Sequence, residues 1–162
     1  MFDKDHIRIG VIGWGRRGRI LARIAAEVTG GLLKAVAYAD PGAEMVQVRD
    51  EPHSNRPRRY HNASAMLAEE SLDGVLICSP NDFHLGNLTA LKGSRLPILL
   101  EKPLESSFKK ICEVLRYART YTGPIVVSHC MRYAPILREA ERMLKRGDIG
   151  PVSYTHLTLP TN

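Results

Sequence analysis

The chain has 162 residues, the size of one domain, and its 44% of hydrophobic residues suffice for a buried core. No stretch approaches the roughly 20 apolar residues of a membrane span, and the charged residues 1–6 lead directly into a strand-like run, which leaves no room for a signal peptide. We therefore expect a cytoplasmic protein with no membrane partner. The cysteines, Cys78, Cys112 and Cys130, are odd in number and widely spaced, which favours reduced core thiols over a disulfide framework or a metal site.

The most informative segment is residues 7–18, IRIGVIGWGRRG, in which an apolar strand runs into a Gly-x-Gly-x-x-Gly turn. In such a turn Gly13 lets the chain leave the strand sharply, and Gly15 lets backbone N–H groups approach a pyrophosphate. Gly18 lets the following helix pack closely on the sheet. The segment therefore predicts a dinucleotide-binding site.

The next two elements agree with this interpretation. A helix expected at 16–29 begins with Arg16 and Arg17, and its positive N-terminal end would face the phosphates. A second apolar run at 33–39 then ends in Asp40, close to where an acid that binds the ribose is expected.

Asp40 also bears on the choice of cofactor. Its carboxylate can accept hydrogen bonds from the ribose 2′-hydroxyl, but it would repel the 2′-phosphate of NADP by about 4 kcal/mol at 4 Å if the effective dielectric is near 20. Pro41 and Gly42 follow, with no adjacent arginine to compensate. We therefore expect NAD rather than NADP, although Arg16 or Arg17 could weaken this preference by reaching around.

Part of the net charge of +6 falls in four arginines between positions 49 and 59. A basic patch can attract nucleic acid. This one is interrupted by prolines and has no stacking aromatic before Tyr60, so we interpret it as a surface loop and expect no nucleic-acid partner.

Polar residues follow three later strands, at the sheet edge where the glycine turn also lies. In sheets of this kind ligands bind beyond the carboxyl ends of the strands. Each residue alone could be a helix cap, a surface ion pair or a core histidine, but together they favour a ligand site. They are Ser79, Asn81 and His84 after the strand at 74–79, Glu101 and Lys102 after that at 97–101, and Arg132 after that at 124–128.

Strands alternate with helices along the chain, which predicts an α/β protein with a doubly wound parallel sheet and helices on both faces, a Rossmann fold. The expected strands are 7–12, 33–39, a short one near 58–60, 74–79, 97–101 and 124–128. The expected helices are 16–29, 42–49, 63–70, 83–92, 106–121 and 134–146.

Over about residues 5–151 the chain resembles the N-terminal domain of the glucose-fructose oxidoreductase, inositol dehydrogenase and rhizopine-catabolism (Gfo/Idh/MocA) family. The resemblance implies an NAD(P)-dependent oxidoreductase that moves a hydride between a nicotinamide and a hydroxyl carbon of a sugar, cyclitol or related polyol. The shared motifs are the glycine turn, Asp40, Ser-Pro-Asn-x-x-His at 79–84, Glu-Lys-Pro at 101–103 and Arg-Tyr-x-Pro at 132–135.

The resemblance makes Lys102 the catalytic residue, at the nicotinamide end, where it would touch the substrate hydroxyl and assist proton transfer. A positioned acid–base group contributes roughly 10² to 10⁴ in rate. Pro103 would restrict Lys102 to an extended backbone and help to aim it. Of the other residues, Glu101 would hold the lysine or ribose hydroxyls, Asn81 and His84 would lie along the ribose and nicotinamide, and Arg132 would lie near the carboxamide or substrate.

The end of the chain departs from the family pattern. The family continues into a second domain that supplies the substrate pocket and the oligomer interface, whereas residues 152–162 resemble a translated sequencing adapter. We therefore expect a dinucleotide-binding domain at 1–151 and an artefactual tail at 152–162. On this view the chain is the truncated cofactor half of a homo-oligomeric parent enzyme, and it binds NAD without turnover.

Two other functions stay open at this point. A related NAD-dependent glycosidase would break a glycosidic bond through transient oxidation, and a non-catalytic regulator would sense a dinucleotide. A glycosidase would release a sugar and recycle NAD, whereas a dehydrogenase would give a net redox change. Lys102 argues against a regulator, because a sensor has less need of a lysine beside the nicotinamide. A methyltransferase or epimerase fits the glycine turn but not the Glu-Lys-Pro motif.

Overall fold

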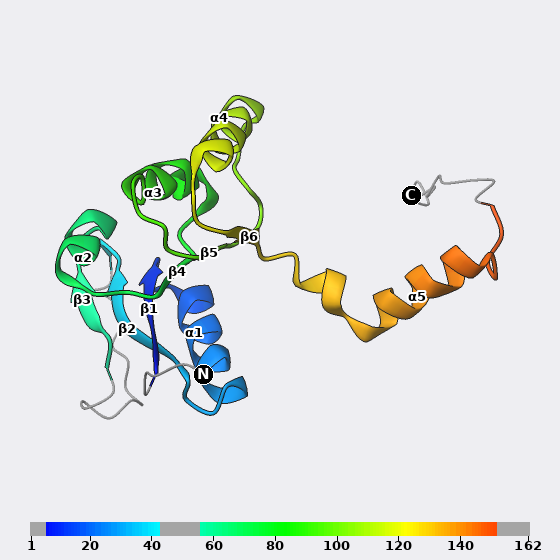
Figure 1. Cartoon of the computed structure of the whole chain (residues 1–162), viewed down its shortest axis with the longest axis horizontal. Coiled ribbons are helices and arrows are strands. Elements are labelled where there is room, and N and C mark those ends of the chain that lie inside the picture. The colour runs from blue at the N-terminus through cyan, green and yellow to red at the C-terminus, as the bar shows by residue number, and fades with distance from the viewer. Residues whose placement is uncertain (1–5, 43–55, 152–162) are drawn as a thin grey trace, which may run out of the picture. The chain divides into compact units, whose positions relative to one another are not determined.

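The computed structural model describes residues 6–42 and 56–151, and the chain divides after Ser128 into two units, each described by itself. The first unit holds the sheet and four helices, and the second, from His129, holds one further helix (Figure 1).

The first unit is built on a parallel sheet with the strand order β3-β2-β1-β4-β5-β6. The order reverses between β1 and β4, and the carboxyl ends of strands at such a switch point are where ligands bind. The predicted doubly wound sheet is therefore confirmed. The strands are β1 (Ile7–Ile12), β2 (Leu33–Ala39), β3 (Arg58–Tyr60), β4 (Gly74–Ile77), β5 (Ile98–Leu100) and β6 (Ile125–Val127).

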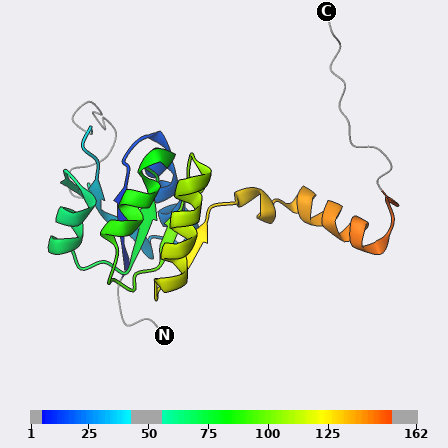
Figure 2. The ribbon, with the colours of Figure 1, turned by 90° about the horizontal axis from the view of Figure 1, so that it is seen from above.

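Helices lie on both faces of the sheet, as Figures 1 and 2 show. On one face lie α2 (Ala63–Glu69), α3 (His84–Ala90) and α4 (Phe108–Thr120), with a 3₁₀ turn, η3 (Asn81–Phe83), before α3. On the other face lies α1 (Arg16–Val28). The predicted helices match these except at their ends, while the one expected at 42–49 falls almost wholly outside the described residues.

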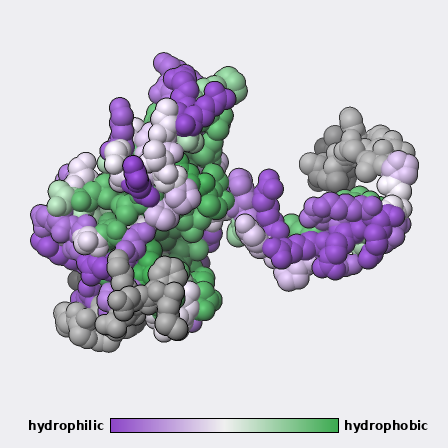
Figure 3. Space-filling model, in the orientation of Figure 1, coloured by the Kyte–Doolittle hydropathy of each residue, from purple (hydrophilic) through white to green (hydrophobic). Residues whose placement is uncertain are grey.

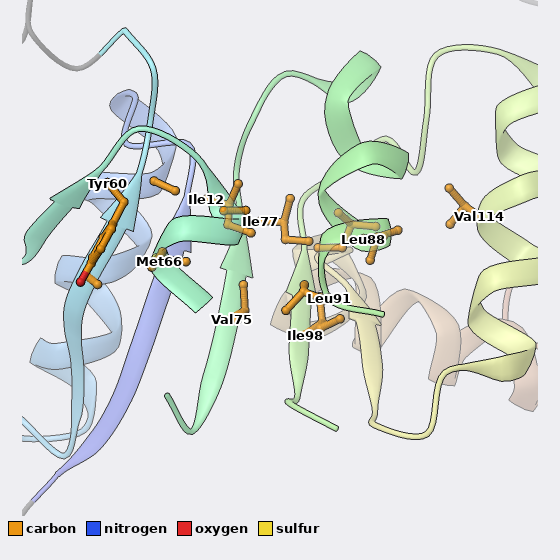
Figure 4. Packing of buried hydrophobic residues seen from close by; sticks show 13 residues of the cluster. Ile12, Tyr60, Met66, Val75, Ile77, Leu88, Leu91, Ile98 and Val114 are labelled. Atoms are coloured by element: carbon orange, nitrogen blue, oxygen red, sulfur yellow. The ribbon is translucent and has the colours of Figure 1, made fainter. Parts of the chain in front are cut away.

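The alternation of side chains along β1 produces two cores. Ile12 belongs to the larger cluster, on the side of α2, α3 and α4, whereas Val11 belongs to a smaller cluster beside α1. Figure 4 shows the larger cluster, in which Met66, Ile77 and Leu88 are fully buried. Burying one such side chain contributes about 1.5–3 kcal/mol. This packing holds the strand ends, and therefore the loops that follow them, in place.

The α1 face is covered only in part within the first unit. Beside α1, strands β4, β5 and β6 leave an apolar groove of about 840 Å³, in which Leu99 and Val126 are 39% and 52% exposed. Figure 3 shows apolar surface between α1 and β6.

The second unit is a short helical segment. A 3₁₀ turn, η4 (Cys130–Tyr133), precedes α5 (Pro135–Arg146), which begins with proline at its first turn and ends at Gly147 with φ +79°. Proline is favoured at that first position, and glycine is favoured where a helix ends in the left-handed region. An ion pair of 2.7 Å between Glu141 and Lys145 supports the exposed face of α5.

The three cysteines are free thiols, but of the three predicted core thiols only Cys78 packs against a core cluster. Cys78 and Cys112 are partly buried, and Cys130, in η4 of the second unit, is exposed. In the described part of the chain, no helix is both long and apolar enough to cross a membrane.

Candidate cofactor site

A cavity of about 830 Å³ opens at the carboxyl ends of β1, β2 and β4. Its walls come from the glycine turn, the end of β2, the loop before α2 and the loop after β4. Its volume is within the range of small-molecule sites. Of the residues predicted from the sequence, it brings together Gly13, Gly15, Arg16, Arg17, Asp40 and Ser79.

The three glycines of the turn have different environments. Gly13 has φ +92°, and a Cβ there would lie 2.4 Å from the backbone nitrogen of Ser79. A Cβ on Gly18 would lie 2.1 Å from the carbonyl oxygen of Gly13, so this glycine lets α1 approach the turn. A Cβ on Gly15 would meet no atom within 4 Å. Packing therefore requires Gly13 and Gly18, whereas Gly15 borders open space in the cavity.

The first turn of α1 faces this open space without a side-chain cap. Its N-cap is Gly15, and its first turn contains no acidic residue. Backbone N–H groups at such an end carry partial positive charge and suit a phosphate. Arg16 and Arg17, which begin the helix, line the cavity as well.

Asp40 ties the glycine turn to the end of β2. Its Oδ2 accepts a hydrogen bond of 2.8 Å from the backbone N–H of Trp14, and its Oδ1 accepts one of 2.9 Å from Gly42. The Trp14 ring stacks on Tyr38, with centroids 4.7 Å apart. Each carboxylate oxygen has two lone pairs, so Asp40 keeps capacity to accept from a ligand hydroxyl.

The loop after β4 is held from behind by a buried histidine. His84 is 1% exposed, with Nε2 at 3.0 Å from the carbonyl oxygen of Ser79 and Nδ1 at 3.3 Å from that of Leu104. Asn87 lines the cavity and donates a 2.9 Å hydrogen bond to Oγ of Ser79. Asn81 lies in η3, where its carbonyl accepts from the His84 N–H. Neither His84 nor Asn81 lines the cavity.

The Glu-Lys-Pro segment follows β5 and connects with the glycine turn. Arg17 donates from Nε (3.0 Å) and Nη2 (2.9 Å) to Oε1 of Glu101, whose side chain is 7% exposed. Burial, followed by the negative charge of Glu101, raises the pKa of Cys78 to about 12, against the opposite effect of Arg17. Lys102 is exposed, does not line the cavity, and precedes Pro103 through a cis peptide bond.

A further predicted residue does not line the cavity, and two lining residues directly after β3 were not predicted. Arg132 is exposed in η4 and belongs to the second unit. His61 and Asn62 line the cavity but were not predicted. They directly follow β3, so the rule that ligand-binding residues follow strand ends could have found them. Asn62 also caps α2, because its Oδ1 accepts from the N–H of Ala65 at 2.9 Å.

Comparison with known proteins identifies the family to which the chain is similar. Residues 7–129 match the family model of the Gfo/Idh/MocA oxidoreductases, described as an oxidoreductase family with an NAD-binding Rossmann fold. The chain is 29% identical to the rhizopine catabolism protein MocA of Rhizobium meliloti over 143 residues, which are 88% of this chain and 44% of that protein. It is 27% identical to an inositol 2-dehydrogenase of Corynebacterium glutamicum, over 89% of this chain and 42% of that enzyme.

Solved structures share the fold. The myo-inositol 2-dehydrogenase of Lactobacillus plantarum superimposes with a TM-score of 0.77 at 24% identity, over 90% of this chain and 42% of that one. The WlbA dehydrogenase of Chromobacterium violaceum, solved with NADH and UDP-GlcNAcA, gives 0.78 at 17% identity, over 92% and 42%. The chain thus spans less than half the length of the relatives it matches. Because the family model covers most of its residues, the chain belongs to the Gfo/Idh/MocA family of oxidoreductases, with an NAD-binding Rossmann fold.

Proposed function

We propose that this chain is the cofactor-binding part of an NAD-dependent dehydrogenase that acts on a hydroxyl carbon of a sugar, cyclitol or related polyol. The observation that carries the proposal is the cavity at the switch point of the sheet, bordered by the uncapped end of α1 and by Asp40. Bound there, NAD would supply the hydride acceptor or donor.

The residues around the cavity suit two parts of a dinucleotide, its pyrophosphate and one ribose. The open space at Gly15 and the positive charge of Arg16 suit a pyrophosphate, while Arg17 lines the same cavity and binds Glu101. Asp40, at the end of β2, suits a ribose with a free 2′-hydroxyl. Ser79 and Asn87 would form the wall along the rest of the cofactor.

The cofactor preference follows from charge. Both oxygens of Asp40 already accept backbone N–H groups, which hold the carboxylate at the cavity edge. A 2′-phosphate brought to the same position would meet a fixed negative charge. We therefore propose NAD as the preferred cofactor, with NADP weaker.

Lys102 is proposed as the catalytic residue. It is exposed and follows β5, the neighbour of β4 in the sheet, and we expect its ammonium group to reach a substrate hydroxyl beyond the cavity edge. A lysine there can exchange a proton with the hydroxyl that gains or loses a hydride. The polyol class is supported by relatives such as the inositol dehydrogenases.

This chain alone is expected to bind NAD without turnover. Hydride transfer needs the donor and acceptor atoms held about 3–3.5 Å apart. The relatives are more than twice as long as the segment matched here, and we propose that the missing length supplies the substrate pocket.

The test is a titration of the purified chain with NADH and NADPH, followed by nicotinamide fluorescence, with calorimetry for the oxidised cofactors. The expected result is binding of NADH, weaker binding of NADPH, and no NADH formation from myo-inositol or scyllo-inositol. Tighter binding of NADPH than of NADH would refute the preference for NAD. If neither cofactor bound, the proposed function would be refuted. Formation of NADH from an inositol would refute the proposal that this chain lacks the substrate pocket.

A further inference from the structure

The loop that follows β5 exposes one lysine between two buried acids. Lys102 is exposed, whereas Glu101 and Glu105 are only 5% and 4% exposed. Glu101 is bound by Arg17 of α1, as described above. Burial of a carboxylate is unfavourable unless hydrogen-bond donors surround it. The partners of Glu105 therefore indicate what its burial achieves.

Glu105 connects the loop to α3. Its Oε1 accepts a hydrogen bond of 3.2 Å from the backbone N–H of Leu85, in the first turn of α3. Its Oε2 accepts from the backbone N–H of Ser106 at 2.8 Å and from the Ser106 hydroxyl at 3.2 Å. Lys110 of α4 lies 4.0 Å from the same oxygen. Burial by itself raises the pKa of Glu105, but these donors hold it below its ordinary value.

His84 makes a second connection one residue away. Its ring lies between the carbonyl oxygens of Leu104, in this loop, and Ser79, in the cavity wall. Lys110 also donates a 3.0 Å hydrogen bond to the carbonyl of Asp82, in η3. Buried His84 therefore joins the loop, at Leu104, to the cavity wall, and buried Glu105 joins it to α3. Leu104 and Glu105 lie two and three residues after Lys102.

We infer that Glu105, together with His84, is a positioning residue that holds the Lys102 loop in a fixed place beside the cofactor cavity. The inference rests on the proposed function, because it is Lys102 that needs to be positioned at the nicotinamide end. Glu105 itself is buried and does not line the cavity. Its carboxylate acts through the backbone of the loop, which it fixes to α3.

The experiment compares NAD with ADP-ribose, which lacks the nicotinamide ring, in the full chain. In the Glu105→Gln variant the loop loses a charged acceptor, so we expect NAD to bind about tenfold more weakly, the size of one hydrogen bond to a charged group. ADP-ribose affinity should stay within about twofold. Hydrogen exchange of the amides at 102–106 should be faster, with protection of β1 and β4 unchanged.

Two further variants keep the test decisive. Ser106→Ala removes one donor at an exposed residue and should give a smaller effect of the same kind. Glu27→Gln, in an exposed ion pair with Arg23, is the matched control and should change neither affinity. If Glu105→Gln does not fold, Ser106→Ala alone provides the comparison of the two ligands.

The outcomes separate the two proposals. Selective loss of NAD affinity in Glu105→Gln, or in Ser106→Ala, supports positioning. Unchanged affinities, or equal loss for both ligands, would overturn it and leave Glu105 as part of the general framework. Failure of the unmodified chain to bind either ligand would refute the proposed function, and the positioning role with it.

Discussion

Substitution by alanine at Gly18 and at Gly15 of the glycine turn should affect different properties, stability in the first case and NAD affinity in the second. A Cβ on Gly18 would lie 2.1 Å from the carbonyl oxygen of Gly13, more than 1 Å short of the 3.4 Å at which ordinary contact begins. Both groups are backbone, so no side-chain rotation relieves the clash and α1 must move. We place the cost of Gly18→Ala at the upper end of overpacking, about 3 kcal/mol. For a chain of this size that lowers Tm by about 6–12 °C.

Gly15→Ala should leave stability almost unchanged. Gly15 has φ −69° and ψ −170°, which an L-residue adopts without strain, and its Cβ would meet no atom within 4 Å. Alanine is a poorer N-cap than glycine by about 0.5–1 kcal/mol, but it loses less backbone entropy on folding by a similar amount. The new methyl group does, however, occupy the space proposed for the pyrophosphate. NAD affinity should fall roughly tenfold to a hundredfold.

The assay is thermal unfolding of each variant together with NAD titration. Gly86→Ala is the control, because Gly86 lies in α3 with no atom near its absent Cβ, and it should alter neither property by much. Unchanged NAD binding by Gly15→Ala would refute the placement of the pyrophosphate. An unchanged Tm for Gly18→Ala would refute the close approach of α1 to the turn.

Three other perturbations test charge in and around the site. Asp40→Asn should bring the affinities for NAD and NADP at least about tenfold closer, because the repulsion of a 2′-phosphate is removed; an unchanged ratio of dissociation constants would contradict this. Since burial, and then Glu101, raises the pKa of Cys78 to about 12, iodoacetamide at about pH 8 should label exposed Cys130 and leave Cys78 unlabelled; equal labelling by mass spectrometry would be incompatible with that. Hydrogen bonds to the carboxylate outweigh burial and lower the pKa of Glu105. The ionised carboxylate therefore stabilises the fold above the ordinary glutamate pKa of about 4.3, and this stabilisation is lost as the pH falls through the lowered pKa. The stability difference between unmodified chain and Glu105→Gln in urea should therefore narrow from about pH 7 to pH 3, and a difference that widens would refute the assignment.

The sheet and the glycine turn could be predicted because their signals are local. Apolar runs mark the strands, and the spacing from Gly18 to Asp40 matches one helix and one strand. The positions at which the strands end could be predicted less exactly. The run at 74–79 continues past Ile77, where β4 ends, and Cys78 and Ser79 instead line the cavity. Composition alone does not distinguish the last strand residue from the first loop residue.

The connections between loops were not predictable, since they join residues far apart in the chain. Arg17 and Glu101, 84 positions apart, were predicted separately as cofactor-binding residues, and the structure pairs them with each other. His84 was expected along the ribose and nicotinamide, yet its ring nitrogens face the backbone carbonyls of Ser79 and Leu104. Glu105 gave no signal at all, because an acid before two serines is typical of an exposed loop.

Glu101 and Glu105 anchor the loop with buried carboxylates, although apolar side chains would do so without the free-energy cost of desolvating a charge. Their placement explains this choice. An apolar anchor tolerates small shifts, because hydrophobic contact has no direction. A buried carboxylate is stable only while its donors stay within hydrogen-bond distance, so a displacement of Glu105 from Leu85, or of Glu101 from Arg17, is penalised at once. Anchoring of this kind restricts position, and Lys102 lies between the two anchored acids.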